Sequence, residues 1–437
     1  MRRKTASVRP VLLAVLLGGA LLAGAALAYA GGAGEGAATK EKPTLVFWQN
    51  EAGSGLSEWY KEVAADINAH EDFQVQVVEN PIANVIDLLT AAGVSQSGFD
   101  ISWDWSGRMS TMLRGQGGVY QPVNGLVPDS ALKQLNQGTI VANTDENGKL
   151  WGVPVFNDTN YLVFNKDILQ KAGVDLKKFS NSWEDFIAAC EKVKKMGVVP
   201  ISFANKEGIV HEFWLLDMMY QYFDNEKQLS DYFLKADFNE PKMKDAMAKY
   251  KYLYDKKYLD PAGETLDYAS NYFSKFSTGQ AAFEWFINSM YVSALKESQI
   301  GEDKIGYLPH VAFGKGALEK KIPGLGYCLT ISAWTKYPKQ AAKAIEYFVG
   351  EKWQSRMLEQ YGVVPANMNV KVKDVNALPP NMKFYYGEHK GQVTLCPYEV
   401  MVGLQYDEAI RLNTPYFHGE ITYEEFARKV SEATKVE

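Results

Sequence analysis

One long extended segment constrains the fold more than any other part of this sequence. Residues 148–166 read GKLWGVPVFNDTNYLVFNK, an apolar run of about 13 residues interrupted by Asn157, Asp158, Thr159 and Asn160. Strands usually have five or six residues, so a strand of this length is unusual within a single sheet. We therefore expect the segment to cross from one domain to another, with its polar middle exposed in the gap between them.

The N-terminal part of the chain alternates strand and helix patterns. An apolar strand pattern at residues 44–48 is followed by Tyr60, Val63 and Ile67 at helical spacing, and then by an alternating strand at residues 73–77. The change of period from two to about 3.6 residues and back indicates a strand, a helix and a second strand. Such a unit is typical of an α/β fold with a parallel sheet.

The next strand ends in aromatic and charged residues. A helical pattern at residues 85–92 leads into FDISW, a strand that we expect to end at Trp103. Ligands of open α/β sheets bind beyond the carboxyl ends of the strands. The loop that follows, DWSGRM, is therefore expected to face a ligand.

Two helices are preceded by capping residues. Ser182 precedes a helical pattern at residues 183–196 and is followed three residues later by Asp185, and Thr422 and Glu425 stand in the same relation before the last helix. This spacing is that of a capping box, in which the N-cap hydroxyl and the later acidic side chain satisfy backbone N–H groups reciprocally. Both helices are expected to start at these positions.

The N-terminus indicates export. Basic residues precede an apolar run at residues 11–27, and Ala28, Tyr29 and Ala30 form an A-x-A cleavage site. Residues 1–30 are interpreted as a secretory signal peptide and residues 31–43 as a flexible leader, in preference to a membrane anchor. No cysteine follows the apolar run, so no lipid anchor is expected. Cleavage would leave a soluble mature chain in the periplasm or outside the cell.

Charge disfavours a nucleic-acid partner. The chain has 46 Lys and Arg against 52 Asp and Glu, and removal of the four basic residues of the signal leaves 42 against 52, a balance of −10. An acidic surface repels phosphate backbones, and no basic patch stands out in the sequence.

The three cysteines indicate neither a metal site nor a dense disulfide framework. Cys190, Cys328 and Cys396 lack the spacing of zinc ligands. Cys190 shares a helical face with Phe186 and Val193 and is expected to be a buried free thiol. Spacing leaves open whether Cys328 and Cys396 form a disulfide.

Four stretches together resemble a known family. The sequence is similar to the extracellular solute-binding proteins of ABC transporters, in the carbohydrate-binding group that includes maltose-binding protein. The stretches are TLVFWQN (44–50), LWGVPVFNDTNYLVFNKDILQKAGVD (150–175), FSTGQAAFEWFINSM (276–290) and GYCLTISAWTKYPKQAAKAIEYFVGEKWQSRMLEQYGVVPAN (326–367). Their order covers nearly the whole mature chain.

The resemblance implies an architecture and a role. The family has a type II periplasmic-binding-protein fold, in which two discontinuous α/β lobes close about a hinge. The first lobe would take residues 44–157 and 326–361, and the second residues 158–325 and 362–437. The implied role is to bind a mono- or oligosaccharide between the lobes and deliver it to a membrane permease, as a monomer without catalysis or cofactor.

A sugar site needs aromatic faces for C–H patches and planar polar groups for hydroxyls. The loop at Trp103, Asp104, Trp105 and Arg108 has both kinds and resembles the family loop that supplies an aromatic, an acid and an arginine to the ligand. Alternation along a strand would place the two Trp side chains on one face and Asp104 on the other, so either Trp can instead belong to the core.

Two further segments of the first half are candidates by resemblance. Gln49, Asn50 and Glu51 follow the first strand, where family members bind ligand hydroxyls; the alternative is the N-terminal turn of a helix. Asp158 matches the acid that the family's crossing strand presents to the ligand, joined by Asn157 or Asn160. The alternative for Asp158 is a hinge residue satisfied by backbone N–H groups.

The second lobe supplies the remaining candidates. Glu212 and Trp214 lie where the family contributes acids and aromatics, whereas neighbouring His211 is expected at the surface. Many family members have a Trp where this chain has Asn288, Ser289 and Met290, so the stacking platform is either moved to Trp285, with Phe286 beside it, or lost.

Two tyrosines are the last candidate site residues, and two other functions are alternatives to sugar binding. Tyr327 and Tyr398 are each as able to pack as to bind. A glycoside hydrolase would need facing carboxylates, and nothing in the spacing of Asp104, Asp158, Glu212 and Glu284 singles out a pair. The same fold with a glycerophosphodiester as ligand would favour positive charge at the site. We expect no enzymatic activity, and a neutral sugar fits the candidate residues better.

Overall fold

The computed structural model describes residues 42–433, apart from 51–54, 82–83, 207, 236–237, 239, 314, 389–392 and 396–402. The expected signal peptide, Glu51, Cys396 and Tyr398 lie outside these residues, as do the side chains of Arg108 and Glu212. Within the described ranges, no helix is both long and apolar enough to cross a membrane.

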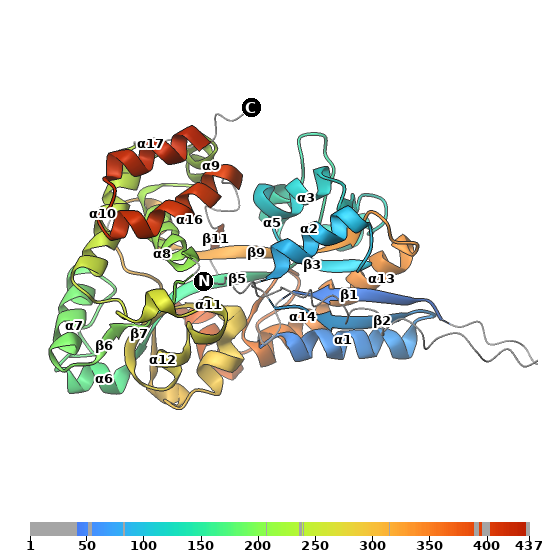
Figure 1. Cartoon of the computed structure of the whole chain (residues 1–437). Helices are drawn as coiled ribbons and strands as arrows, with labels where there is room; N and C mark the ends of the chain where they lie inside the picture. Colours follow the sequence, from blue (N-terminus) through green and yellow to red (C-terminus); the bar gives the residue numbers. More distant parts are fainter. Residues whose placement is uncertain are drawn as a thin grey trace, which may run out of the picture. The chain divides into compact units, whose positions relative to one another are not determined.

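Helices and strands alternate along the chain, as an α/β fold requires (Figure 1). The strands are β1 (Thr44–Gln49), β2 (Gln74–Glu79), β3 (Ile101–Trp105), β4 (Tyr120–Gln121), β5 (Val153–Asn165), β6 (Val199–Ile201), β7 (Ala281–Ile287), β8 (Ile305–Leu308), β9 (Ile322–Ser332), β10 (Val364–Pro365) and β11 (Val393–Leu395).

The α-helices range from single turns to four turns. They are α1 (Ser57–His70), α2 (Val85–Ser95), α3 (Leu113–Gln116), α4 (Asp129–Leu132), α5 (Gln137–Ala142), α6 (Lys166–Lys171), α7 (Trp183–Lys195), α8 (Ile209–Met219), α9 (Glu226–Lys235), α10 (Pro241–Asp255), α11 (Tyr268–Asn271), α12 (Ser274–Ser277), α13 (Pro338–Val349), α14 (Glu351–Arg356), α15 (Pro380–Lys383), α16 (Gly403–Phe417) and α17 (Tyr423–Ala433).

The main strands follow the order β2-β1-β3-β9-β5-β7-β6. Strand β1 pairs in parallel with β2 and β3, which confirms the parallel N-terminal arrangement expected from the sequence. Strands β6 and β7 form a second parallel pair. Between these parallel parts, β9 runs antiparallel to both β3 and β5, and β5 runs antiparallel to β7. The two long strands β5 and β9 therefore link the two parts of the sheet.

Strand β3 is longer than the sequence suggested. It continues to Trp105, because Asp104 and Trp105 pair with Cys328 and Tyr327 of β9. The expected end at Trp103 is therefore wrong. The partner strand is more than 200 residues away in the sequence, so local patterns do not reveal it.

The polar middle of β5 is buried, which corrects the expectation that it would be exposed. All 13 residues of this strand are buried, including Asn157 and Asp158. Pairing with β9 and β10 covers the strand on both sides at this point. The side chains of Asn157, Asp158 and Thr159 bond to other polar side chains instead of to solvent.

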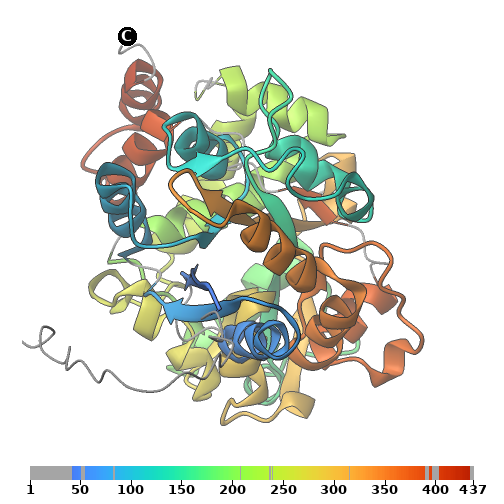
Figure 2. The same ribbon diagram turned by 90° about the vertical axis from the view of Figure 1, so that its right-hand side faces the viewer.

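Helix α1 packs the first part of the sheet from one side. Its buried face includes Tyr60, Val63 and Ile67, the residues whose spacing predicted it. Helices α1 and α13 lie side by side (Figure 2) although they are far apart in the sequence. The ring of Phe348 on α13 packs 5.9 Å from Tyr60, between ring centroids. Segments from both ends of the chain thus form one hydrophobic core.

The helix caps agree with the sequence in part. The Ser182 hydroxyl accepts a hydrogen bond from Asp185 N at 3.2 Å, and the Thr422 hydroxyl accepts one from Glu425 N at 3.1 Å. The Asp185 carboxylate, however, accepts from the backbone and hydroxyl of Ser180, so the reciprocal half of that capping box involves a different residue.

Two other expectations concern buried polar side chains. Cys190 is a buried free thiol, as expected. His211 is buried with no exposed surface, so the expectation of a surface histidine is wrong. The side chain is enclosed by the rings of Phe203, Tyr250 and Phe417. Burial lowers the pKa of His211 to about 3, so the ring is neutral at physiological pH.

Candidate functional site

A row of aromatic rings crosses the three central strands. Trp103 and Trp105 of β3 meet edge to face with ring centroids 5.1 Å apart, Trp103 lies 4.8 Å from Tyr327 of β9, and Tyr327 stacks on Phe156 of β5 at 4.5 Å. Trp103, Tyr327 and Phe156 are buried, whereas Trp105 is partly exposed. Trp105 therefore ends the row, at the carboxyl end of β3 where the sequence placed a ligand.

Asp104 points away from these rings into a buried ion pair. Its carboxylate accepts hydrogen bonds from Tyr120 Oη at 2.8 Å and Trp105 N at 2.8 Å, and lies 3.3 Å from Arg114 Nη1. Burial raises the pKa of Asp104, and the positive charge of Arg114 opposes this rise. The expected ligand acid is thus held inside the first part of the molecule. Arg114, which sequence analysis missed, is its counter-ion.

The loop after β1 is fixed by side-chain amides. Asn50 Nδ2 donates to Ser102 Oγ at 2.9 Å and to the Trp103 carbonyl at 2.7 Å, and Asn80 Nδ2 donates to Asn50 Oδ1 at 2.9 Å. Asn50 and its neighbour Gln49 are fully buried. Asn50 thus joins the ends of β1, β2 and β3, a role that stabilises the edge where the expected site begins.

The loop after β3 is held by a residue that the sequence did not indicate. Asn143 Oδ1 accepts a hydrogen bond from Gly107 N at 2.9 Å, and Asn143 Nδ2 donates to Ser106 Oγ at 3.1 Å. Gly107 has φ of +103°, a conformation that side chains other than glycine rarely adopt. Gly107 comes two residues after Trp105, so its conformation fixes the direction in which the chain leaves the strand.

Asp158 is anchored across the sheet. Its carboxylate accepts hydrogen bonds from Ser289 N at 2.9 Å and from the Ser289 hydroxyl, and it has no exposed surface. Burial raises the pKa of Asp158 to about 7, although the Ser289 hydrogen bonds favour the ionised form. These contacts match the alternative of a hinge residue satisfied by a backbone N–H group.

Asn288 extends this anchor into a network. Its side chain bonds to Thr159 and Tyr161 of β5, and Asn381 Nδ2 donates to Asn288 Oδ1 at 3.0 Å and to the Gly362 carbonyl at 2.7 Å. Asn288 and Ser289 thus connect the end of β7 with β5.

The remaining candidates of the first part are also buried. Asn157 Oδ1 accepts from Thr139 Oγ1 at 3.1 Å, and both residues are enclosed. Tyr327 lies in the aromatic row already described. Of the described candidate side chains in this part, Trp105 is the one that keeps partial exposure.

The aromatic candidates of the second part lie in its core. Trp214 is parallel to Tyr250 with ring centroids 6.1 Å apart, and Phe286 lies 5.3 Å from Tyr161. Trp285, expected as a stacking platform, is 2% exposed. A sugar therefore reaches these rings only if the surrounding elements move apart.

Two surface cavities lie elsewhere. One of about 450 Å³ is lined by Trp183, Phe313, Lys249 and neighbouring residues, and one of about 650 Å³ is lined by Tyr307, Phe384 and others. None of the residues expected to bind a ligand lines either cavity.

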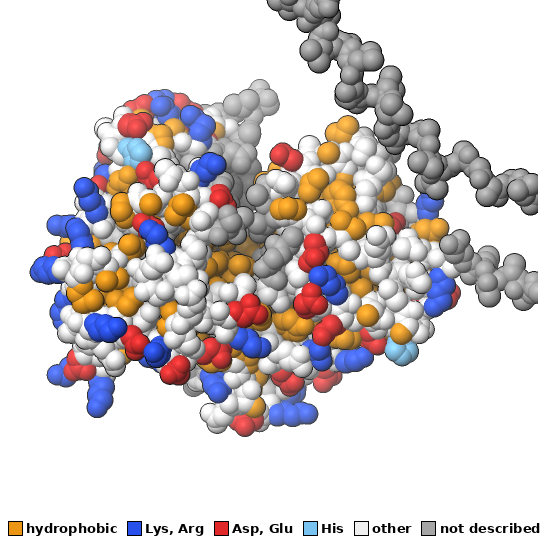
Figure 3. Space-filling model, turned by 60° about the horizontal axis from the view of Figure 1, so that its bottom comes forward, with side chains coloured by type: hydrophobic (Ala, Val, Ile, Leu, Met, Phe, Trp, Pro, Cys, Tyr) orange, Lys and Arg blue, Asp and Glu red, His pale blue; other side chains and the backbone are white. Residues whose placement is uncertain are grey.

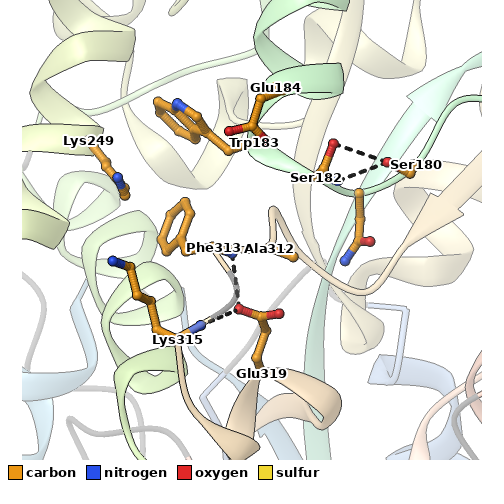
Figure 4. A pocket seen from close by; sticks show the side chains of 10 residues that line it. Ser180, Ser182, Trp183, Glu184, Lys249, Ala312, Phe313, Lys315 and Glu319 are labelled. Carbon is orange, nitrogen blue, oxygen red and sulfur yellow. Dashed lines mark hydrogen bonds between the residues drawn. The ribbon is translucent and has the colours of Figure 1, made fainter.

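Polar groups of the smaller cavity are engaged internally. Figure 4 shows Lys249 beside the rings of Trp183 and Phe313, and its Nζ lies 5.6 Å and 5.3 Å from their centroids. Glu319 accepts hydrogen bonds from the backbone N–H groups of Phe313 and Lys315. The ammonium group covers the ring faces, so this cavity is a poor platform for stacking.

Neither the surface charge nor the described metal-binding side chains mark a further site. Figure 3 shows acidic and basic side chains interspersed over one face of the molecule. A mixed surface of this kind does not mark a phosphate-binding patch. The described residues contain no group of three or more His, Cys, Asp or Glu side chains that could hold a metal ion.

Comparison with known proteins identifies relatives. Residues 53–355 match a family model described as bacterial extracellular solute-binding protein. No reviewed protein sequence matches the chain.

Solved structures share the fold at low identity. A protein from work on xylan utilization by the thermophilic bacterium Caldanaerobius polysaccharolyticus has a TM-score of 0.78 and 21% identity, over 90% of this chain and 100% of the other. A chitin oligosaccharide binding protein has a TM-score of 0.76 and 19% identity, over 90% and 98%. A maltose-bound protein of T. maritima has a TM-score of 0.71 and 18% identity, over 90% and 99%. These likenesses confirm the two-lobed α/β fold.

Proposed function

Because the chain belongs to the bacterial extracellular solute-binding proteins, we propose that it binds a neutral mono- or oligosaccharide between its two lobes and delivers it to the permease of an ABC transporter. The proposed lobes are those that the family resemblance implies, residues 44–157 with 326–361 and residues 158–325 with 362–437. Two of their limits fall inside β5 and β9, the two strands that link the parallel parts of the sheet, and the third falls at Gly362, just before β10.

One observation supports a sugar as the ligand most directly. The aromatic row through Phe156, Tyr327 and Trp103 ends at the partly exposed Trp105, where β3 reaches its carboxyl end. Trp105 packs against Trp103, which is itself held by the rest of the row, so it presents a rigid apolar face at little cost in conformational entropy. The C–H face of a pyranose is the complementary surface, and the relatives named for chitin oligosaccharides and maltose have the same fold.

The acids of the site support binding without reaction. Asp104 is committed to Arg114 and Tyr120, and Asp158 to Ser289. Both carboxylates are thus engaged by protein groups, whereas a glycoside hydrolase requires two carboxyl groups that face its substrate. The ion pair of Asp104 and Arg114 also occupies a cation that a phosphate-bearing ligand would need.

A ligand screen tests the proposal. Purified mature protein is heated with maltose, xylobiose and N,N′-diacetylchitobiose, and with glycerophosphocholine and amino acids as controls. A ligand that binds the native state alone raises its stability by about 2.7 kcal/mol at a hundredfold excess over Kd. Stabilisation by a sugar and not by the controls supports the proposal. A response to glycerophosphocholine alone would keep the fold and replace the sugar.

Delivery and location belong to the same proposal. The mature protein is expected in the periplasm or outside the cell, as a monomer that docks on the permease in its ligand-bound form. Sugar-stimulated ATP hydrolysis by the cognate transporter in proteoliposomes, strictly dependent on added protein, tests delivery. Size-exclusion chromatography with light scattering tests the monomer.

A further inference from the structure

Several buried polar atoms of the second part have no hydrogen-bond partner among the described residues. Three of them share one region: Asn160 Oδ1 on β5, and Trp214 Nε1 and Asp217 Oδ1 on α8. Asn160 and Trp214 are 2% exposed and Asp217 is 7% exposed. Native proteins leave few buried polar groups unsatisfied, so such a group calls for a specific explanation.

The strand register brings Asn160 to one face with Trp285. Asn160 of β5 pairs with Ile287 of β7, and Leu162 pairs with Trp285. Residues paired in an antiparallel ladder point to the same side, and their diagonal neighbours stay within reach of long side chains. Asn160 and Trp285 are such diagonal neighbours.

Helix α8 adds the acid to this face. Trp285 forms a hydrogen bond with Asp217, which favours the ionised carboxylate, while burial raises the pKa of Asp217 well above its usual range. Trp214 precedes Asp217 by three residues, so the two side chains lie on the same face of α8. The amide, the indole groups and the carboxylate thus line one region from β5 across β7 to α8.

The topology gives this region a place at the ligand-binding edge. Strands β6 and β7 are parallel, and Ile287 is the last residue of β7, so Asn160 lies at the carboxyl edge of this pair. Ligands of α/β sheets bind beyond such edges. Asn160 also comes two residues after Asp158, whose contact with Ser289 ties the same edge to the crossing.

We propose that Asn160 and Asp217 are specificity-determining residues of the sugar site, which accept hydrogen bonds from two hydroxyl groups of a neutral sugar. The inference rests on the proposed function and deepens it. Trp214 Nε1 donates to an oxygen of the same sugar. Because these side chains are buried, the sugar enters while the lobes are apart and is enclosed when they close. Two acceptor atoms without a protein partner, Asn160 Oδ1 and Asp217 Oδ1, select hydroxyl donors and disfavour a carboxylate on the ligand.

The test compares two properties of the same variants. Asn160→Leu and Asp217→Leu remove the unpartnered atoms and keep the number and branching of the side-chain heavy atoms. Since an unsatisfied polar group destabilises the free protein, Asn160→Leu should melt at or above the wild-type temperature without ligand. Asp217→Leu also loses the contact with Trp285 and should melt close to the wild type. For maltose, xylobiose or N,N′-diacetylchitobiose, whichever stabilises the wild type, Kd should rise at least tenfold in each variant.

A matched control is the buried acid Asp260, whose carboxylate lies 2.5 Å from Lys275 Nζ. Asp260→Leu should lower the melting temperature and leave Kd unchanged. Glucose and glucuronate form a matched ligand pair, and the wild type should favour glucose whereas Asp217→Leu should discriminate less.

Two results would overturn the inference separately from the proposed function. If the wild type binds a sugar and both Leu variants bind it equally well, the function stands and these residues are not part of the site. If the Leu variants melt as low as Asp260→Leu, their polar atoms are satisfied in the free protein and have a structural role. If no sugar stabilises the wild type, the proposed function fails and the inference fails with it.

Discussion

The Asp158 carboxylate in the middle of β5 accepts hydrogen bonds from both the backbone N–H and the hydroxyl of Ser289, which follows β7. This contact connects a crossing strand with the first turn after its neighbour. It makes Asp158 a titratable group inside the linkage between the two parts of the sheet.

Asp158→Asn should flatten the pH dependence of stability. Burial raises the pKa of Asp158 from 3.8 to about 7, so the folded protein holds a proton that the unfolded chain releases. The contribution of this proton to the free energy of unfolding is therefore complete below about pH 4. It is lost as the pH rises to about 7, by at most about 1.4 kcal/mol per pH unit. Thermal unfolding of the wild type and of Asp158→Asn at pH 4 to 8 measures how steeply the stability of each depends on pH. Equal slopes would show that Asp158 titrates normally.

Trp103→Ala and Trp105→Ala should separate stability from binding. Trp103 is fully buried, so its truncation should reduce the free energy of unfolding by about 3–5 kcal/mol. Trp105 is partly exposed at the end of the aromatic row and should lose less stability and more sugar affinity. Urea unfolding and calorimetric titration with the stabilising sugar measure both. Unchanged affinity in Trp105→Ala would remove this ring from the site.

Arg114→Met should destabilise the protein by about 3–5 kcal/mol, because it leaves the Asp104 carboxylate buried without its counter-ion. The double variant Asp104→Asn with Arg114→Met should recover much of the loss, since neither charge then remains. Both should retain sugar affinity, measured by titration below the unfolding transition. A stable Asp104→Asn variant that cannot bind sugar would instead support the ligand role first assigned to Asp104.

The mature chain should begin at Gly31. The A-x-A pattern ends at Ala30, and cleavage there removes residues 1–30. Intact mass measurement of the protein secreted by a bacterial host reads the new N-terminus directly. Full-length protein in the membrane fraction would favour the anchor over the signal peptide.

Local periodicity predicted the elements but not the polar interior. The strand at residues 44–48 and the helical face of Tyr60, Val63 and Ile67 follow from hydrophobic spacing alone, and the structure has both. The environments of Asp158 and His211 depend on partners distant in sequence. Ser289 is 131 residues from Asp158, and Phe417 covers His211 from near the C-terminus.

The prediction of site residues was limited for the same reason, because the partners of these residues are distant in the sequence. Alternation along β3 correctly separated Asp104 from Trp103 and Trp105, because it depends only on strand geometry. Whether Asp104 met a ligand or a counter-ion depended on Arg114, which no motif marks. Asp217 was missed because a single acid on an apolar helix has no distinctive spacing.

The position of β9 has a consequence for synthesis. This strand lies between β3 and β5 in the sheet, yet it comprises residues 322–332 of a chain of 437. As the ribosome extends the chain, β3 and β5 are present long before the strand that joins them, so the sheet cannot be continuous until β9 has been made. Contacts so distant in sequence form late because the chain between them must first be closed into a loop. This order of synthesis delays completion of the sheet until most of the chain has been made, which would suit the export signal expected from the sequence.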